Sequence, residues 1–258
     1  MYNSPDMPAP PTSNISDSTP NNLVDIVRAG EVLNFTLNNP DRGNEVTRSM
    51  FDAMLAEFHT EASSPRARVL RIRARGPVFC GGRERAARDP DAIRAEAARI
   101  VEFKRVLRTS SLITVAEVQG DAFGFGMGLA VVCDFTLVSA KASLGFPEMR
   151  HGLAPAAIMA YLGEYALPRF AFPLVLFGEP FSPQQALEIG LISKVCEAES
   201  LSAEADALVS RILELDAVAT RRCKEFFLTA QSHTFAQNCD LALDALTAGT
   251  LDALGRKK

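Results

Sequence analysis

The sequence predicts an α/β fold that ends in a helical region. The chain has 258 residues, which suits one large α/β domain or one domain with a helical appendage. Two segments of strand character, residues 69–73 and 113–118, each lead into a glycine-rich turn. After Pro155 the apolar residues recur mostly at helical spacing. A hydrophobic content of 47% supplies a sizeable core for such a fold.

The N-terminal segment differs in composition from the rest. Residues 1–21 are rich in Pro, Ser, Asn and Thr, and such a segment buries too little apolar surface to offset its ordering entropy. We therefore expect a disordered leader over residues 1–21, and we divide the rest into a core over residues 22–197 and a helical region over residues 198–258.

The first half of the core alternates strands and helices. Residues 24–28 and 32–37 have the apolar alternation of a hairpin that turns at Gly30. Thr47 is a suitable N-cap for a helix that runs to about residue 61. Residues 91–108 form an amphipathic helical pattern.

The second half of the core is followed by helices. Residues 134–139 and 142–146 have strand character, and a helix begins after Ser182 and ends at Gly190. The further helices that we expect cover residues 201–215, 218–230 and 235–246.

The most informative stretch covers residues 119–155. It follows a strand and carries four glycines within nine residues, Gly120, Gly124, Gly126 and Gly128, before an apolar helical segment. The first turn of a helix has unpaired N–H donors and the positive end of the helix dipole, so it favours developing negative charge. The Gly-Lys-Ser/Thr of a phosphate loop and the spacing of a dinucleotide fingerprint are both missing.

A second glycine turn strengthens the functional interpretation. It follows the strand at residues 69–73 and reads Phe79-Cys80-Gly81-Gly82-Arg83-Glu84. Two turns from separate strands can supply one N–H donor each, which is the geometry of an oxyanion hole.

Together these motifs resemble the enoyl-CoA hydratase/isomerase (crotonase) superfamily over nearly everything past the leader. In that family the first loop usually reads Phe-Cys/Ala-Ala-Gly-Ala-Asp-Leu, and the second reads Asn-Gly-x-Ala-x-Gly-Gly-Gly-x-Glu-Leu-Ala-x-x-Cys-Asp. This chain has residues 79–84 and 119–134 at those places. The resemblance implies a spiral core of ββα repeats and homo-trimers or homo-hexamers. It also implies that the helical region of residues 198–258 serves in oligomerisation or as a lid.

The resemblance also implies a site. The oxyanion donors would be the amides of Arg83 and Phe125, and Arg42, in the loop of residues 38–44, would offer a charge to the phosphates of coenzyme A. The remaining substrate contacts that we expect are Gly81, Gly82, Gly124, Phe123, Met127, Gly128 and His151. The substrate would be an acyl-CoA thioester, and no cofactor other than this coenzyme A is implied.

Glu148 is the candidate general acid/base, since it matches the second of two glutamates that hydratases of the family commonly carry. The position of the first glutamate holds Gly128. Asp121 has two interpretations, a replacement carboxylate or a loop residue that bonds its own backbone, and the second is favoured. His151 is either a proton shuttle or a structural residue.

We therefore expect an acyl-CoA enzyme of the hydratase/isomerase group, of the kind used in fatty acid metabolism, that stabilises a thioester enolate. One carboxylate is enough to move a proton between α and γ carbons, whereas hydration is easier with two. The alternatives are a lyase or hydrolase of the same family that acts on another acyl-CoA, and a catalytically impaired acyl-CoA-binding member.

Composition excludes several other classes. A net charge of −4 leaves no basic footprint for nucleic acid, and the sequence has no membrane-spanning apolar run. Five cysteines without a CxxC pair indicate reduced thiols and a cytoplasmic protein. His59 and His233 lack companions at metal-ligand spacing, so we expect no metal site.

Overall fold

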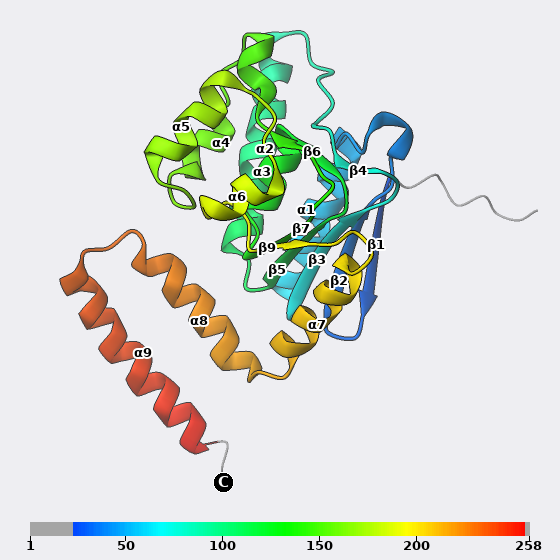
Figure 1. Cartoon of the computed structure of the whole chain (residues 1–258). Coiled ribbons are helices and arrows are strands. Elements are labelled where there is room, and N and C mark those ends of the chain that lie inside the picture. The colour runs from blue at the N-terminus through cyan, green and yellow to red at the C-terminus, as the bar shows by residue number, and fades with distance from the viewer. Residues whose placement is uncertain (1–22, 256–258) are drawn as a thin grey trace, which may run out of the picture.

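The core of the molecule is a six-stranded sheet. A computed structural model describes residues 23–255, so the predicted leader lies outside the described residues. The strand order is β1-β2-β3-β5-β7-β9, in which β1 and β2 form the predicted antiparallel hairpin and the other neighbours are parallel (Figure 1). The strands are β1 (Val24–Ala29), β2 (Val32–Leu37), β3 (Val69–Ala74), β5 (Ile113–Val118), β7 (Phe135–Ser139) and β9 (Lys194–Cys196).

A second sheet of three short parallel strands stands beside the first. Its order is β4 (Val78–Cys80), β6 (Asp121–Phe123) and β8 (Leu144–Gly145). Each of these strands directly follows a strand of the large sheet, so the chain repeats a unit of long strand, short strand and helix. This is the predicted ββα core. The strand β8 is shorter than the predicted 142–146 because Phe146 already turns toward the next helical segment.

The helices up to α6 share one apolar cluster with the large sheet. They are α1 (Arg48–Ser63), α2 (Pro90–Thr109), α3 (Phe125–Val131), α4 (Ala156–Leu162), α5 (Pro168–Phe177) and α6 (Pro183–Glu188), with short 3-10 turns η1 (Pro40–Arg42) and η2 (Pro147–His151). The predicted caps are present, since the side chains of Thr47 and Ser182 accept hydrogen bonds from the amides of Met50 and Gln185. The largest buried side chains between these helices and the sheet include Phe35, Phe79, Phe103 and Phe146.

The other face of the sheet is covered by α7 (Leu201–Leu213). Val115 and Leu137 of the sheet pack there against Ala205 and Val209, in a separate apolar cluster. The buried Arg71 on β3 donates to Glu117 Oε2 at 2.7 Å and also pairs with a carboxylate of α7. Because both faces of the sheet are covered, every residue of β5 is buried.

The last two helices, α8 (Ala217–Ala230) and α9 (Phe235–Gly255), form an antiparallel pair that stands off from the body of the protein (Figure 1). Lys224 attaches α8 to the core, because its buried Nζ lies 2.7 Å from both Leu112 O and Asp134 Oδ2. The α9 helix was predicted to end at residue 246, which was wrong. It passes through Gly249, since one glycine costs about 1 kcal/mol and the flanking Ala and Leu residues favour the helix.

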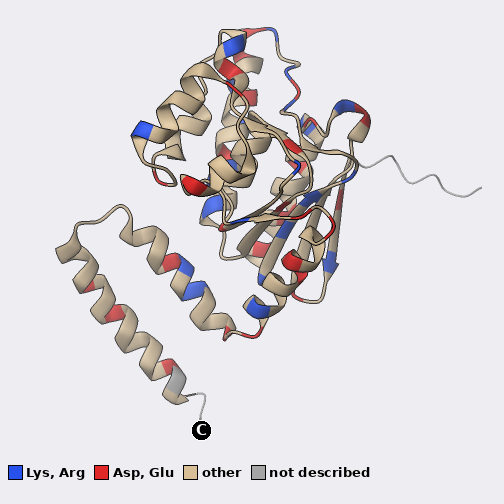
Figure 2. Cartoon of the chain, in the orientation of Figure 1, with Lys and Arg blue, Asp and Glu red and all other residues tan. Residues whose placement is uncertain are grey.

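The terminal helices leave apolar side chains open to solvent. Lys and Arg are absent from α9 up to Gly255, and most of its surface carries no charge (Figure 2). The most exposed apolar residues of the pair are Phe227, Phe235, Leu243, Leu246, Leu251 and Leu254. Within residues 23–255, none of the helices has the length and apolar character needed to cross a bilayer.

Candidate active site

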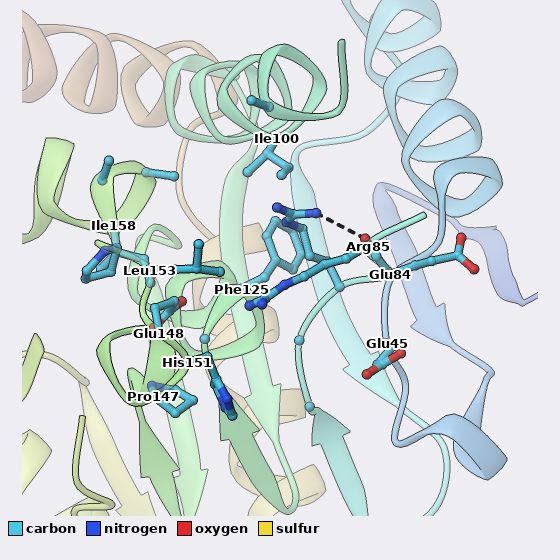
Figure 3. A pocket seen from close by; sticks show the side chains of 18 of the residues that line it. Glu45, Glu84, Arg85, Ile100, Phe125, Pro147, Glu148, His151, Leu153 and Ile158 are labelled. Atoms are coloured by element: carbon cyan, nitrogen blue, oxygen red, sulfur yellow. Dashed lines mark hydrogen bonds between the residues drawn. The ribbon is translucent and has the colours of Figure 1, made fainter. Parts of the chain in front are cut away.

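Three neighbouring parallel strands deliver three candidate catalytic groups to one edge of the small sheet. Arg83 follows β4, Phe125 follows β6, and Glu148 follows β8. All three residues line a cavity of about 840 Å³. Glu148 and His151 lie on one side of this cavity and Glu84 on the other, with Phe125 between them (Figure 3). The carboxyl edge of the small sheet is therefore the candidate active site.

The amides of Arg83 and Phe125 are available to a ligand. Within the described part of the chain, neither amide donates a hydrogen bond to another group. Gly82 O accepts from Val46 N at 3.1 Å, and Glu84 N donates to Val46 O at 3.0 Å. Because N–H directions alternate along an extended chain, the Arg83 amide between these two bonds points away from Val46. Phe125 is the first residue of α3, where amides have no partner inside the helix.

Glycines allow the two loops to approach each other. A Cβ on Gly126 would lie 2.1 Å from the carbonyl oxygen of Cys80, so only glycine permits α3 to begin against β4. Gly124 has φ 53° and ψ −117°, a conformation that L side chains rarely adopt, and it turns the chain from β6 into α3. Gly81, Gly82 and Gly124 all line the cavity, as predicted substrate contacts should.

Glu148 lies next to the second loop. Its Oε1 would be 3.1 Å from a Cβ on Gly124, which places the carboxyl group beside the start of α3. Its Oε2 is buried and has no hydrogen-bond partner in the described part of the chain. Burial raises the pKa of Glu148 above its ordinary value, against the opposing charges of Lys104, Arg85 and His151. A desolvated carboxyl group with a free oxygen is suited to proton transfer.

The site contains a lysine and a tyrosine that sequence reasoning missed. Lys104 on α2 is only 5% exposed, and its ammonium donates a hydrogen bond to the hydroxyl of Tyr161 on α4. The Tyr161 hydroxyl in turn donates to Gly128 O at 2.9 Å. Lys104 Nζ lies 5.1 Å from the ring centroid of Phe125 and 4.9 Å from that of Tyr161. Burial lowers the pKa of Lys104 to about 7, although the charge of Glu148 opposes this shift.

A signal for Lys104 was present in the sequence. Ile100 and Leu107 belong to the apolar face of the predicted helix, and Lys104 follows Ile100 by four positions and precedes Leu107 by three. Residues at these spacings share one face of a helix. A lysine on the buried face, rather than on the solvated one, indicates a polar partner inside the protein.

The space beside Gly128 is occupied by this pair. A Cβ on residue 128 would lie 2.2 Å from Lys104 Nζ and 2.6 Å from the Tyr161 hydroxyl. The volume of the missing glutamate is therefore filled by protein and is not open to a bulkier acyl group. Met127 is fully buried in the core, and Phe123 packs against Gly145. The lining of the cavity includes none of the three predicted contacts Phe123, Met127 and Gly128.

Charged residues surround the mouth of the cavity. Arg42 lines it as expected, but its guanidinium lies 3.7 Å from Glu45 and 3.6 Å from Glu84. Arg85 and Arg88 line the same mouth and were not predicted, although both follow the first glycine loop directly. The sequence analysis therefore predicted fewer positively charged side chains at the mouth of the cavity than the structure has there.

The two remaining polar candidates differ in their placement. His151 lines the cavity and is exposed, which is compatible with a substrate contact. Asp121 is the first residue of β6, and its Oδ1 accepts a hydrogen bond from Ser143 N, just before β8, at 2.9 Å. Asp121 is absent from the cavity lining, but the favoured interpretation was wrong in detail, because the carboxylate bonds the backbone of a neighbouring segment and not its own.

The repeated ββα units and the three loops at their common edge define the crotonase fold class. Solved structures of this class superpose closely: an enoyl-CoA hydratase from Mycobacterium smegmatis has a TM-score of 0.85 at 23% identity, over 89% of this chain and 91% of that one. The enoyl-CoA hydratase/isomerase family model matches residues 28–251, and the chain belongs to that family.

Relatives by sequence agree with this assignment. The chain is 29% identical over 229 residues to the mitochondrial enoyl-CoA hydratase domain-containing protein 3 of Danio rerio, which covers 87% of this chain and 78% of the relative. A Thermobifida fusca homologue solved in complex with CoA has a TM-score of 0.82 at 27% identity, over 90% of this chain and 95% of that one. The predicted cytoplasmic location stays a prediction, because the fish relative is named a mitochondrial protein.

Proposed function

We propose that this protein moves a proton at the carbon α to the carbonyl of an acyl-CoA thioester, as an enoyl-CoA hydratase or isomerase. One observation carries the proposal. Two amides without a hydrogen-bond partner in the described part of the chain and one buried carboxyl oxygen, each just after a different strand, belong to residues that line the same cavity. Family membership supports the acyl-CoA substrate class.

The chemistry follows from the three groups. The thioester oxygen accepts hydrogen bonds from the Arg83 and Phe125 amides, which hold the negative charge of the enolate. By comparison with other oxyanion holes, each donor contributes roughly 3 kcal/mol. Glu148 removes the α proton and returns it at the γ carbon in isomerisation. The negative charge moves from carboxylate to thioester oxygen and back, so atoms and charge balance.

The nucleotide part of coenzyme A would lie at the mouth of the cavity. Arg85 and Arg88 offer donors for its phosphates. Arg42 can add a third guanidinium when a phosphate replaces Glu45 and Glu84 as its partner. The Thermobifida fusca homologue in complex with CoA supports this ligand class. We expect Arg85→Ala to weaken CoA binding more than pantetheine binding, because pantetheine lacks the phosphates.

We further propose that the protein is a homo-trimer or homo-hexamer. The exposed apolar side chains of α8 and α9 support this proposal, since a monomer would leave them in water. Light scattering after size-exclusion chromatography measures the mass. A monomer at micromolar concentration would contradict the proposal.

The decisive experiment is turnover of defined thioesters. Purified protein is mixed with crotonyl-CoA and with 3-enoyl-CoA, and ultraviolet absorbance of the conjugated double bond is followed while products are identified by mass. Hydration removes the conjugated absorbance, and isomerisation of a 3-enoyl thioester creates it. Release of free CoA would indicate a hydrolase, a cleaved acyl carbon chain would indicate a lyase, and binding without turnover would indicate an impaired family member.

A further inference from the structure

We propose that Lys104, held in place by Tyr161, is a second proton-transfer group of the site and accepts the proton of the water that adds to the β carbon of the substrate. This inference rests on the proposed function and specifies its hydration branch. In this role Lys104 is a catalytic residue, and Tyr161 is a positioning residue.

The first support is the position of the amine. Lys104 lines the same cavity of about 840 Å³ as Glu148 and the two amides. It also lines a neighbouring cavity of about 510 Å³ that extends toward α8. Val101, Ala156 and Ala157 border both cavities, so Lys104 stands where the two meet. The Lys104 side chain therefore borders both spaces.

The second support is the orientation of the hydrogen bonds. The Tyr161 hydroxyl has a single proton, and it donates this proton to Gly128 O at 2.9 Å. Tyr161 can therefore only accept from Lys104, and it fixes one direction of the amine. The other two positions on Nζ have no hydrogen-bond partner within residues 23–255. When the amine is neutral, one of them is a lone pair.

The third support is a comparison between two buried lysines. Lys224 is 7% exposed and pairs with the carboxylate of Asp134 and the carbonyl of Leu112, both at 2.7 Å. Lys104 is 5% exposed and, within residues 23–255, has no ion pair within 4.0 Å. Its ammonium lies over two aromatic rings and donates a hydrogen bond to one hydroxyl. Lys224 has the partners of a structural lysine, whereas Lys104 has those of a group that can lose its proton.

The ionisation of the two groups fits this assignment. Burial raises the pKa of Glu148 and lowers that of Lys104 to about 7, so the two groups approach each other in acidity. A protonated Glu148 with a neutral Lys104 places no ionised group of this pair in the desolvated cavity. Their titrations are coupled, and a kinetic profile would report pKa values of the pair.

Hydration can then be written as a balanced step. The water oxygen forms a bond to the β carbon, and its proton goes to the neutral amine of Lys104. The thioester oxygen holds the enolate charge, and Glu148 in its acid form gives its proton to the α carbon. The site is left with a Lys104 ammonium and a Glu148 carboxylate, and one proton passes back between them to restore the starting state. Isomerisation uses the Glu148 carboxylate alone.

Lys104→Met tests the proposal, because methionine keeps the length of the chain and removes the amine. We expect hydration of crotonyl-CoA to lose at least about a hundredfold in kcat/KM, as for loss of a general base. Isomerisation of a 3-enoyl-CoA should lose about tenfold at most. The hydratase pH profile of the unmodified protein should have a limb near neutrality that comes from Lys104. This limb should be absent from the profile of Lys104→Met.

Two further variants keep the test decisive. Lys224→Met removes the other buried lysine and should leave the ratio of hydration to isomerisation unchanged in the folded fraction. Tyr161→Phe removes the hydrogen bond that favours the charged amine, so the hydratase profile should move to lower pH even if Lys104→Met folds poorly. A hydration to isomerisation ratio that stays constant in Lys104→Met, or a Tyr161→Phe profile that does not move, would overturn the proposal. Absence of both activities in the unmodified protein would instead refute the proposed function.

Discussion

Glu148→Gln removes the titratable carboxyl group from the cavity and keeps the volume of the side chain. We expect the rate of isomerisation to fall by about 10² to 10⁴, the usual contribution of a general acid/base, which corresponds to about 3 to 5 kcal/mol in the activation barrier. The fold should tolerate the change, because Glu148 Oε2 has no hydrogen-bond partner in the described part of the chain to lose. The proposed oxyanion donors are backbone amides on other loops, so thioester binding should survive.

The assay compares unmodified and variant protein in two measurements. The initial rate with a 3-enoyl-CoA gives the loss in kcat, and calorimetric titration with a non-reactive acyl-CoA gives the affinity. The reasoning is refuted if the variant keeps more than about a tenth of the unmodified rate. A lost affinity with an unchanged thermal midpoint would instead place Glu148 among the binding residues.

The pH dependence gives an independent check on Glu148. Burial raises its pKa, and the carboxylate is the form that removes a proton. Isomerase activity should therefore be present above this raised pKa and should fall as the pH is lowered through it. The midpoint should lie above the value of about 4.3 that is typical of an exposed glutamate. A kcat/KM profile that is flat down to that value would contradict the assigned base.

Three substitutions test the packing around the site. Gly126→Ala places a methyl group 2.1 Å from the carbonyl of Cys80, so we expect a loss of several °C in thermal midpoint with loss of activity, measured by circular dichroism and turnover. Gly128→Glu places a carboxylate where hydratases of the family commonly carry their first glutamate, but its Cβ would lie 2.2 Å from Lys104 Nζ and 2.6 Å from the Tyr161 hydroxyl, and we expect a lower thermal midpoint with no gain in hydration rate. Lys224→Met removes the cation that pairs with the partly exposed Asp134 carboxylate and should destabilise the attachment of α8, which hydrogen exchange of α8 amides would report, with unchanged protection as the contradicting result.

Local rules account for the parts of the fold that sequence reasoning predicted well. The hairpin at Gly30 and the caps at Thr47 and Ser182 depend on a few neighbouring residues, so their signals are complete within one short segment. The end of α9 was misjudged because glycine inside a helix is a small penalty that the flanking residues outweigh. Element boundaries depend on such small differences, whereas the existence of the elements does not.

The site was predictable to the extent that backbone motifs define it. The glycine turns indicated both amides because glycine in these places reports close contact of backbone with backbone. The surroundings of Gly128 were not predictable in the same way. Lys104 and Tyr161 approach it from two other helices, 24 and 33 positions away in the chain, and a single sequence without pairing information does not show which side chains fill a vacated volume.

The two glycine loops offer main-chain amides to the cavity, so the side chains at positions 83 and 125 are available for other contacts. The Arg83 guanidinium forms an ion pair with Glu96 on α2 at 3.4 Å, and the Phe125 ring lies under the ammonium of Lys104 on the same helix. Both side chains therefore connect the candidate oxyanion hole to α2, although the two amides would be present with almost any residue there. Substitution of the side chains at positions 83 and 125 should therefore change how α2 and its lysine lie over the cavity, while the two main-chain amides stay in place. Under the proposed function, reaction preference and thioester recognition would be separable traits, encoded by different atoms of the same two residues.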